Sequence, residues 1–110
     1  MDRSLLAQAF ENLLDNALQH SAPSTSVTVE ARRIDQSGRA WIECQFKDAG
    51  SGFASADLPH LFEPFFSRRP SGTGLGLAIA KRFVEAHDGQ IAPSNLPQGG
   101  AAVIVRLPCL

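Results

Sequence analysis

The apolar positions near the N-terminus recur at the three- and four-residue spacing of an amphipathic helix. This stripe predicts a helix over residues 3–20 with its apolar side facing the core. The members of the stripe are Leu6, Phe10, Leu13 and Ala17, with Leu14 beside them. Residues 21–26, which contain Pro23 among small and hydroxyl side chains, break the pattern and end the helix.

A second helical stripe predicts a helix over residues 75–87. Asp88 and Gly89 follow it and provide the residue types that end helices. Between the two long helices, residues 56–62 are a candidate short helix, which Pro64 limits. The apolar face of the second long helix is expected to hold Leu75, Ile79, Phe83 and Ala86.

Four shorter segments have the apolar and polar composition of strands. Residues 27–32 alternate as a half-buried strand does, and residues 41–47 are their natural hairpin partner across turn residues 35–38. Two further strands are predicted over residues 90–94 and 102–107, joined by a turn that contains Pro97 and two glycines.

The order of these elements is helix, strand, strand, short helix, helix, strand, strand. Because helices and strands do not alternate strictly, the order excludes a Rossmann repeat. It predicts an α+β sandwich, in which one sheet carries helices on one face. The 110 residues suit a single compact domain over residues 1–110.

Composition excludes several classes of partner. Hydrophobic residues make up 44% of the chain and charged residues 19%, as in ordinary globular proteins. A formal net charge of -1 gives no broad basic field, so neither nucleic acid nor an anionic membrane surface is an expected partner. No apolar run is long enough to span a bilayer, and a cytoplasmic domain, with any inner-membrane anchor outside it, is expected. Cys44 and Cys109 lack metal-ligand spacing, which fits reduced thiols.

Two asparagines lie four residues apart in the first helix and so share one of its faces. Asn12 and Asn16 fall at the edge of the apolar stripe, whereas Glu11 and Asp15 point further toward solvent. A carboxamide oxygen can bind Mg²⁺, and the amide NH₂ can donate to phosphate. The spacing alone fits equally well two polar surface residues without a role.

Asp48 continues the inward face of the second strand and is followed by Gly50 and Gly52. A carboxylate at the end of a buried face needs hydrogen-bond donors. On this turn it could accept the exocyclic amine of adenine, or it could simply close the strand as an Asx turn. The apolar residues of that face are Ile42, Cys44 and Phe46.

The sequence GTGLG at residues 72–76 precedes and opens the second long helix. Helix N-termini present free N–H groups and the positive end of the helix dipole, so phosphates bind there. The segment lacks the P-loop pattern, and by itself it fits a flexible loop at a helix start.

Three aromatic residues, Phe62, Phe65 and Phe66, lie just before that segment and are expected to contribute in part to core packing. Arg68 and Arg69 stand between the aromatics and the glycines, where they could reach an anionic ligand or remain solvated.

Taken in order, these segments resemble the catalytic, ATP-binding domain of sensor histidine kinases. That family belongs to the superfamily that also includes gyrase, the MutL mismatch-repair ATPase and a heat-shock chaperone. The resemblance covers nearly the whole chain. The matching segments are FENLLDNA at 10–17 (N box), DAGSG at 48–52 (G1 box), LFEPFF at 61–66 (F box) and GTGLGLAI at 72–79 (G2 box).

The resemblance implies a Bergerat fold, with a mixed, mostly antiparallel sheet and about three helices on one face. It implies Mg²⁺-ATP as ligand, with Mg²⁺ held by Asn16 assisted by Asn12. Asp48 would bind the adenine amino group, and Gly50 and Gly52 would shape that pocket. The remaining residues implied at the nucleotide are Gln19, His20, Phe62, Phe65, Arg68, Arg69, Gly72, Thr73, Gly74, Leu75, Gly76 and Leu77.

The chain departs from the family pattern in three respects. Gln19 and His20 stand where relatives often have lysine and tyrosine, and Arg68 or Arg69 is a candidate to replace the lost charge. Only residues 67–71 separate the F box from the G2 glycines, which is short for the family. No histidine fits the phosphoacceptor box, so the acceptor is expected on a separate dimerisation domain.

The resemblance implies an ATP-dependent protein-histidine kinase, whose phosphoryl group a response-regulator receiver domain takes up next. The isolated chain is not expected to phosphorylate itself. One alternative is a hydrolytic ATPase of the superfamily, which needs a glutamate where Asn12 stands, with Glu11 one residue away. The others are a serine kinase that acts on a sigma-factor antagonist and a non-catalytic module with a degenerate pocket.

Overall fold

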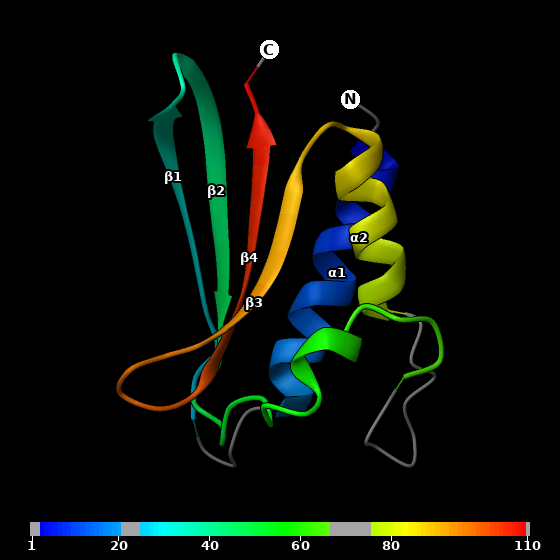
Figure 1. Cartoon of the computed structure of the whole chain (residues 1–110), viewed down its shortest axis with the longest axis vertical. Helices are drawn as coiled ribbons and strands as arrows, with labels where there is room; N and C mark the ends of the chain where they lie inside the picture. The colour runs from blue at the N-terminus through cyan, green and yellow to red at the C-terminus, as the bar shows by residue number, and fades with distance from the viewer. Residues whose placement is uncertain (1–2, 21–24, 67–75, 110) are drawn as a thin grey trace.

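The sheet of this protein has one face covered by helices and one face open (Figure 1). The computed structural model describes residues 3–20, 25–66 and 76–109. Its elements, in chain order, are α1 (Arg3–His20), β1 (Thr28–Gln36), β2 (Arg39–Lys47), the 3₁₀ helix η1 (Leu58–His60), α2 (Gly76–Ala86), β3 (Gln90–Asn95) and β4 (Ala101–Pro108).

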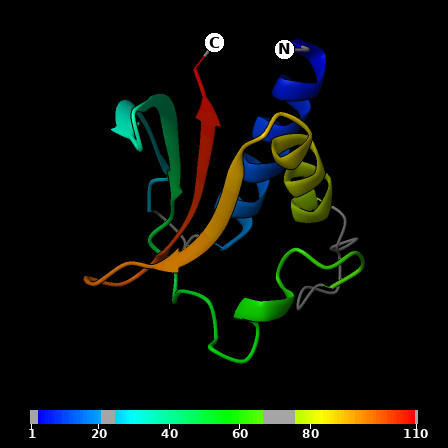
Figure 2. The ribbon, with the colours of Figure 1, turned by 45° about the horizontal axis from the view of Figure 1, so that its top comes forward.

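The four strands form one sheet in the order β1-β2-β4-β3. All three described strand pairings are antiparallel. Both α-helices lie on the same side of the sheet, as two views 45° apart show (Figures 1 and 2). The predicted α+β sandwich is therefore confirmed, with two α-helices and one 3₁₀ helix in the described part of the chain.

A two-residue turn joins β1 to β2. Gln36 pairs with Arg39, which leaves Ser37 (φ 54°) and Gly38 (φ 76°) as the turn. Two successive positive φ angles are the signature of a type I′ hairpin, whose twist matches that of the strands. The first strand therefore continues to Gln36, beyond the predicted range of 27–32.

The first helix contributes the predicted stripe to the core, with one exception. Leu13 and Ala17 are buried, and the Phe10 ring lies edge-on to Phe46 of β2, with centroids 5.4 Å apart. Leu14, expected beside the stripe, is exposed. Since Leu14 lies one residue beyond Leu13, it is rotated by about 100° from the line of contact.

The buried face of α2 differs from the predicted one. Ile79 and Ala86 are exposed, so two of the four expected core positions were wrong, and Leu75 lies outside the described residues. Because α2 packs against both α1 and the sheet, its buried side is wider than a single stripe and includes small residues that allow close approach. The residues buried on α2 are Ala78, Ala80, Phe83 and Val84.

The expectation that the first strand is half buried was wrong. In β1 every residue except Ile34 is exposed, including Val29. The reason is position: α1 packs on β2 and β4, and α2 packs on β3 and β4, so β1 at the sheet edge lies beyond the helical layer. Ile42, on the neighbouring strand, is also exposed rather than buried.

Two further findings concern the helices. The candidate short helix over residues 56–62 is one turn of 3₁₀ helix, Leu58–His60, with Pro59 in its first turn.

Among the residues that the structure describes, no helix is both long enough and apolar enough to cross a membrane.

Candidate nucleotide-binding site

The two asparagines of α1 lie where the helical spacing predicts, at the edge of the buried face. Asn16 is buried, at 9% exposure, and Asn12 is half-buried. Glu11 and Asp15, one residue earlier in each case, are exposed. Both asparagines therefore lie at the border between core and solvent. A buried carboxamide needs hydrogen-bond partners or a ligand, so this position suits ligand contact.

The amino-terminal end of α2 comes against Asn12. A methyl group built on Gly76 would lie 3.8 Å from Asn12 Cβ and 3.9 Å from Asn12 Oδ1. The structure thus brings together two segments that are more than sixty positions apart in sequence. Leu77, next on α2, is half-buried and packs against the core. The other expected residues of this segment, Gly72, Thr73, Gly74 and Leu75, lie outside the described residues, as do Arg68 and Arg69.

Asp48 lies directly after β2 and is buried, at 6% exposure. Its Oδ1 accepts hydrogen bonds from the backbone N–H of Gly50 (2.8 Å) and of Ala101 (3.3 Å). The bond to Gly50 closes an Asx turn, so the turn considered from the sequence does form. Oδ2 accepts no hydrogen bond from any residue of the described ranges. The carboxylate is therefore held by one oxygen and can accept a ligand donor with the other.

Three elements that carry expected site residues converge toward one end of the molecule. The carboxyl end of β2, which leads into Asp48, lies toward the same end as the second half of α1 and the start of α2 (Figure 1). Gln19 in the last turn of α1 is exposed, and the side chain of His20 is outside the described part. This convergence brings the elements that carry Asn12 and Asn16, Asp48 and Gly76 toward one end of the molecule.

Comparison with known proteins decides the family. The profile described as "Histidine kinase-, DNA gyrase B-, and HSP90-like ATPase" matches residues 1–110. The chain belongs to this ATPase family. It is 46% identical to the sensor protein SphS of Synechococcus elongatus over 97% of this chain, and it spans 28% of the length of SphS.

Solved structures agree with this ATPase-domain assignment. A mycobacterial sensor histidine kinase, MprB, superposes with a TM-score of 0.87 at 35% identity, over 98% of this chain and 72% of that one. Full-length ShkA in complex with AMPPNP superposes with a TM-score of 0.79 at 28% identity, over 94% of this chain and 21% of that one. The chain is therefore an ATPase domain of the histidine-kinase type, and the resemblance inferred from the sequence is confirmed.

The F box of this ATPase domain contributes to the core only in part. Leu61 is buried, and Phe62 and Phe66 are half-buried against the core. Phe65 is 76% exposed with φ 66°, so the expectation of core packing was wrong for this residue. A positive φ is uncommon for a bulky residue such as phenylalanine.

One cation near the F box was not singled out from the sequence. Lys81 of α2 places Nζ 5.8 Å from the centre of the Phe62 ring. Helical spacing alone could not have found this contact, because the two residues belong to separate segments. His60, in the same region, bonds Glu63 through Nδ1 at 2.8 Å and stacks against Phe66.

The open face of the sheet holds a buried carboxylate that the sequence analysis missed. Glu43 of β2 is 2% exposed. Its Oε1 accepts from Gln45 Nε2 (2.8 Å) and Arg32 Nε (3.1 Å), and its Oε2 accepts from Arg106 Nε (2.8 Å). These donors, led by Gln45, lower the pKa of Glu43 although burial opposes the shift.

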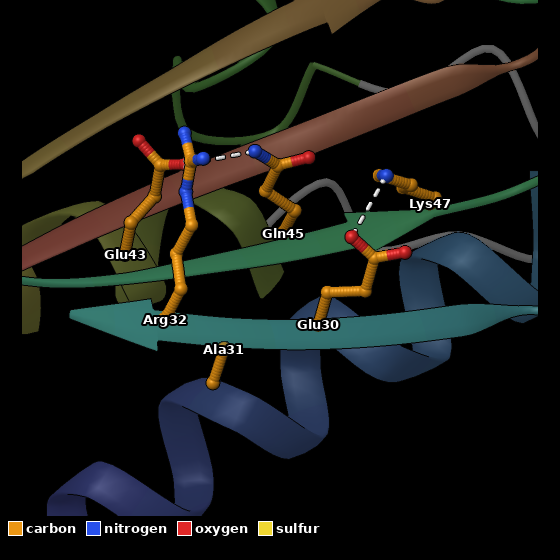
Figure 3. Close-up of a pocket in the computed structure, with 6 residues that line it drawn as sticks. All are labelled: Glu30, Ala31, Arg32, Glu43, Gln45 and Lys47. Carbon is orange, nitrogen blue, oxygen red and sulfur yellow. Dashed lines mark hydrogen bonds and ion pairs between the residues drawn. The ribbon is translucent and has the colours of Figure 1, made fainter. Parts of the chain in front are cut away.

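Arg32, Glu43 and Gln45 of this network line an open hollow of about 500 Å³. Figure 3 shows them with Glu30 and Lys47, which line the same hollow and form an ion pair. The two charged atoms of that pair are 3.0 Å apart. Strand alternation puts Glu43, Gln45 and Lys47 on the side opposite Cys44, Phe46 and the helices. The network therefore stabilises the sheet from its open face, opposite the side that carries the helices and the candidate site.

Proposed function

We propose that this domain binds Mg²⁺-ATP and donates its γ-phosphoryl group to a histidine on a separate dimerisation domain. The proposal is supported most directly by the approach of Gly76, at the start of the G2 helix, to Asn12 of the N box. Membership in the ATPase family and the similarity to sensor kinases such as SphS supply the reaction class. A response-regulator receiver domain is the proposed next acceptor.

Asn16, assisted by Asn12, is proposed to hold Mg²⁺ on the triphosphate. Both are neutral oxygen ligands at the edge of the buried face, which suits a hard cation that arrives with its own phosphate ligands. Bound Mg²⁺ would neutralise part of the phosphate charge. The N–H groups at the start of α2 and the preceding residues 72–75 are proposed to contact the phosphates.

Asp48 is proposed to bind the adenine amino group through Oδ2, since Oδ1 is already engaged by Gly50 and Ala101. Gly50 and Gly52 would shape the base pocket. The remaining proposed nucleotide contacts are Gln19, His20, Phe62, Phe65, Arg68, Arg69 and Leu77.

In the proposed reaction an imidazole nitrogen of the acceptor histidine attacks the γ-phosphorus. The bond from that phosphorus to the β,γ-bridging oxygen breaks, ADP leaves, and the imidazole proton passes to solvent. Such transfer depends on positioning and charge neutralisation more than on covalent participation by the protein. The residues of this domain would therefore act by binding and orienting the nucleotide, in a cytoplasmic setting.

Two measurements on the chain itself test the proposal. Calorimetric titration with ATP should detect binding that strengthens when Mg²⁺ is present, and Asn16→Ala should remove that Mg²⁺ dependence. Glu11→Ala, an exposed neighbour on the same helix, should leave binding unchanged.

Labelled ATP should then yield phosphohistidine only when a histidine-bearing dimerisation domain is added. The absence of nucleotide binding would favour a non-catalytic module. Steady hydrolysis that depends on Glu11 would favour the hydrolytic ATPase. The exposed side chain of Glu11, turned away from the two asparagines, argues against that alternative.

A further inference from the structure

We propose that Asn95, at the end of β3, is a positioning residue that fixes the base-binding loop and thereby sets the preference for adenine over guanine. This inference rests on the proposed function, because it concerns the loop that carries Asp48. The loop comprises residues 48–53 and lies between β2 and the start of the F-box region. Asn95 is 42 positions beyond Phe53, and no sequence motif connects them.

The side chain of Asn95 makes two hydrogen bonds to the backbone at the far end of the loop. Phe53 N–H donates to Asn95 Oδ1 at 2.7 Å, and Asn95 Nδ2 donates to the Phe53 carbonyl at 3.0 Å. Only a carboxamide offers one donor and one acceptor side by side for a single residue's backbone. The two bonds also fix which side-chain atom is oxygen and which is nitrogen.

The near end of the loop is held by the residue directly opposite Asn95 in the sheet. Ala101 of β4 pairs with Asn95 of β3. Ala101 N–H donates to Asp48 Oδ1, and its carbonyl accepts from Asp48 N–H at 2.8 Å. One cross-strand pair therefore clamps both ends of the loop, Asp48 through Ala101 and Phe53 through Asn95.

The close approach of loop and hairpin requires glycine on both sides. At Gly52 (φ 86°) a Cβ would lie 2.8 Å from Asn95 Oδ1. At Gly100 (φ 88°) a Cβ would overlap the carbonyl oxygen of Asp48. Because no side chain fits at these two points, the loop backbone lies directly against the hairpin. We therefore expect the contacts of Asn95 and Ala101 to leave the loop little conformational freedom.

These contacts affect base selection because they hold Asp48, and with it the oxygen Oδ2 that is free to bind a base. Adenine presents an amino donor at position 6, whereas guanine presents a carbonyl acceptor there. A carboxylate oxygen held in place attracts the first and repels the second. If the loop could move, the carboxylate could shift away from the guanine carbonyl. The preference for ATP over GTP would then fall, while nucleotide binding as such would persist.

The test is the ratio of the dissociation constants for Mg²⁺-GTP and Mg²⁺-ATP, measured by competition calorimetry on the whole chain. We expect Asn95→Ala to reduce this ratio by about three- to tenfold, the equivalent of one neutral hydrogen bond. Hydrogen exchange at the Phe53 amide should accelerate in the same variant. Unaltered selectivity together with a faster Phe53 amide would overturn the proposal.

Ile91→Val is the matched control, because Ile91 lies on the same strand and packs partly buried against the core. A purely structural loss lowers the folded fraction and weakens both nucleotides equally, so the ratio stays constant. Asn95→Asp is a second variant that keeps the acceptor for Phe53 N–H but places an oxygen against the Phe53 carbonyl. It should also reduce the ratio.

The outcomes separate this inference from the function on which it rests. If the wild-type chain itself binds no ATP, the proposed function fails. If it binds ATP and GTP equally, the proposed contact between Asp48 and adenine fails, and the inference about Asn95 fails with it. If the wild type prefers ATP and both Asn95 variants keep the full preference, the function stands and the positioning role of Asn95 is wrong.

Discussion

Gly76, the first residue of α2, lies directly against the side chain of Asn12 on α1. A methyl group on Gly76 would make ordinary van der Waals contact with Asn12, at 3.8 Å from Cβ and 3.9 Å from Oδ1. The fold therefore has space for an alanine at this position. The space lies beside the carboxamide that is proposed to act at the triphosphate, and this gives a means of separating stability from ligand binding.

We predict that Gly76→Ala leaves the domain as stable as the wild type or more stable by up to about 1 kcal/mol, because alanine favours the helical state. The added methyl group would stand beside the Asn12 carboxamide, where the triphosphate is proposed to bind. We therefore expect Mg²⁺-ATP binding to weaken on the order of tenfold, the equivalent of about one hydrogen bond. Urea unfolding and calorimetry check the two halves. Glu85→Ala, at an exposed position of α2, should leave ATP binding unchanged. Unaltered ATP affinity in Gly76→Ala would contradict the prediction.

Asp48→Asn tests the base contact without removing the turn. The asparagine oxygen can still accept from Gly50 and Ala101, but its NH₂ replaces the free Oδ2 acceptor and faces the adenine amino group. Loss of a charge-assisted hydrogen bond of about 1.5–3 kcal/mol predicts ATP binding weaker by about 10- to 100-fold. Calorimetry provides the measurement.

Asp88→Asn is the matched control for that change. Asp88 is exposed beyond the end of α2 with φ 59°, a conformation that asparagine tolerates well. It should bind ATP as the wild type does. Equal affinity of Asp48→Asn and Asp88→Asn would mean that Asp48 does not contact the base.

Glu43→Gln should destabilise the sheet without affecting the nucleotide. It removes the charge that Arg32 and Arg106 share, and their partial exposure keeps the expected cost at about 2 kcal/mol, below that of a fully buried ion pair. Glu30→Gln is the control on the same face. Glu30 is exposed beside Lys47, and its loss should cost less than about 1 kcal/mol.

The contribution of Glu43 also depends on pH with a defined sign. Because its hydrogen bonds lower its pKa in the folded state below the ordinary value of 4.5, the carboxylate stabilises the fold fully above that pH. The contribution disappears as the pH falls through the folded-state pKa. Urea unfolding at descending pH should therefore show the wild type and Glu43→Gln converging below pH 4.5. A stability difference that stays constant into strong acid would argue against this account.

The helical period and the strand alternation predicted the parts of the fold that depend on neighbouring residues. The first helix spans the expected residues, and Asp48 continues the buried face of Cys44 and Phe46 as expected. The same rules failed where position in the sheet decides exposure. Val29 belongs to an alternating strand, yet it is exposed because β1 is an edge strand beyond the helices.

The candidate site could be predicted only as far as the family resemblance reached. Asn12, Asn16 and Asp48 could be proposed from the sequence because each belongs to a local segment of recognised pattern. Glu43 and Asn95 were missed because their roles arise from partners far along the chain, Arg106 and Phe53. Alternation places Glu43 on the solvent side, and nothing local indicates that two arginines from flanking strands cover it.

The turn between β3 and β4 offers a direct test of how tightly the hairpin supports Asp48. Gly99 (φ 103°) and Gly100 (φ 88°) both occupy the left-handed region, so alanine at either position incurs a backbone cost of about 1 kcal/mol. They differ in surroundings. A Cβ on Gly99 meets nothing within 4 Å, whereas one on Gly100 would overlap the Asp48 carbonyl oxygen.

We therefore predict that Gly100→Ala is less stable than Gly99→Ala by about 2 kcal/mol, a typical cost of forcing backbone apart in a packed region. In a domain of this size that difference corresponds to a melting temperature lower by roughly 10 °C. Gly100→Ala should also lose ATP selectivity, since the displaced backbone carries the Asp48 carboxylate, while Gly99→Ala should keep it. Equal melting temperatures and equal selectivity would mean that the loop adjusts independently of the hairpin.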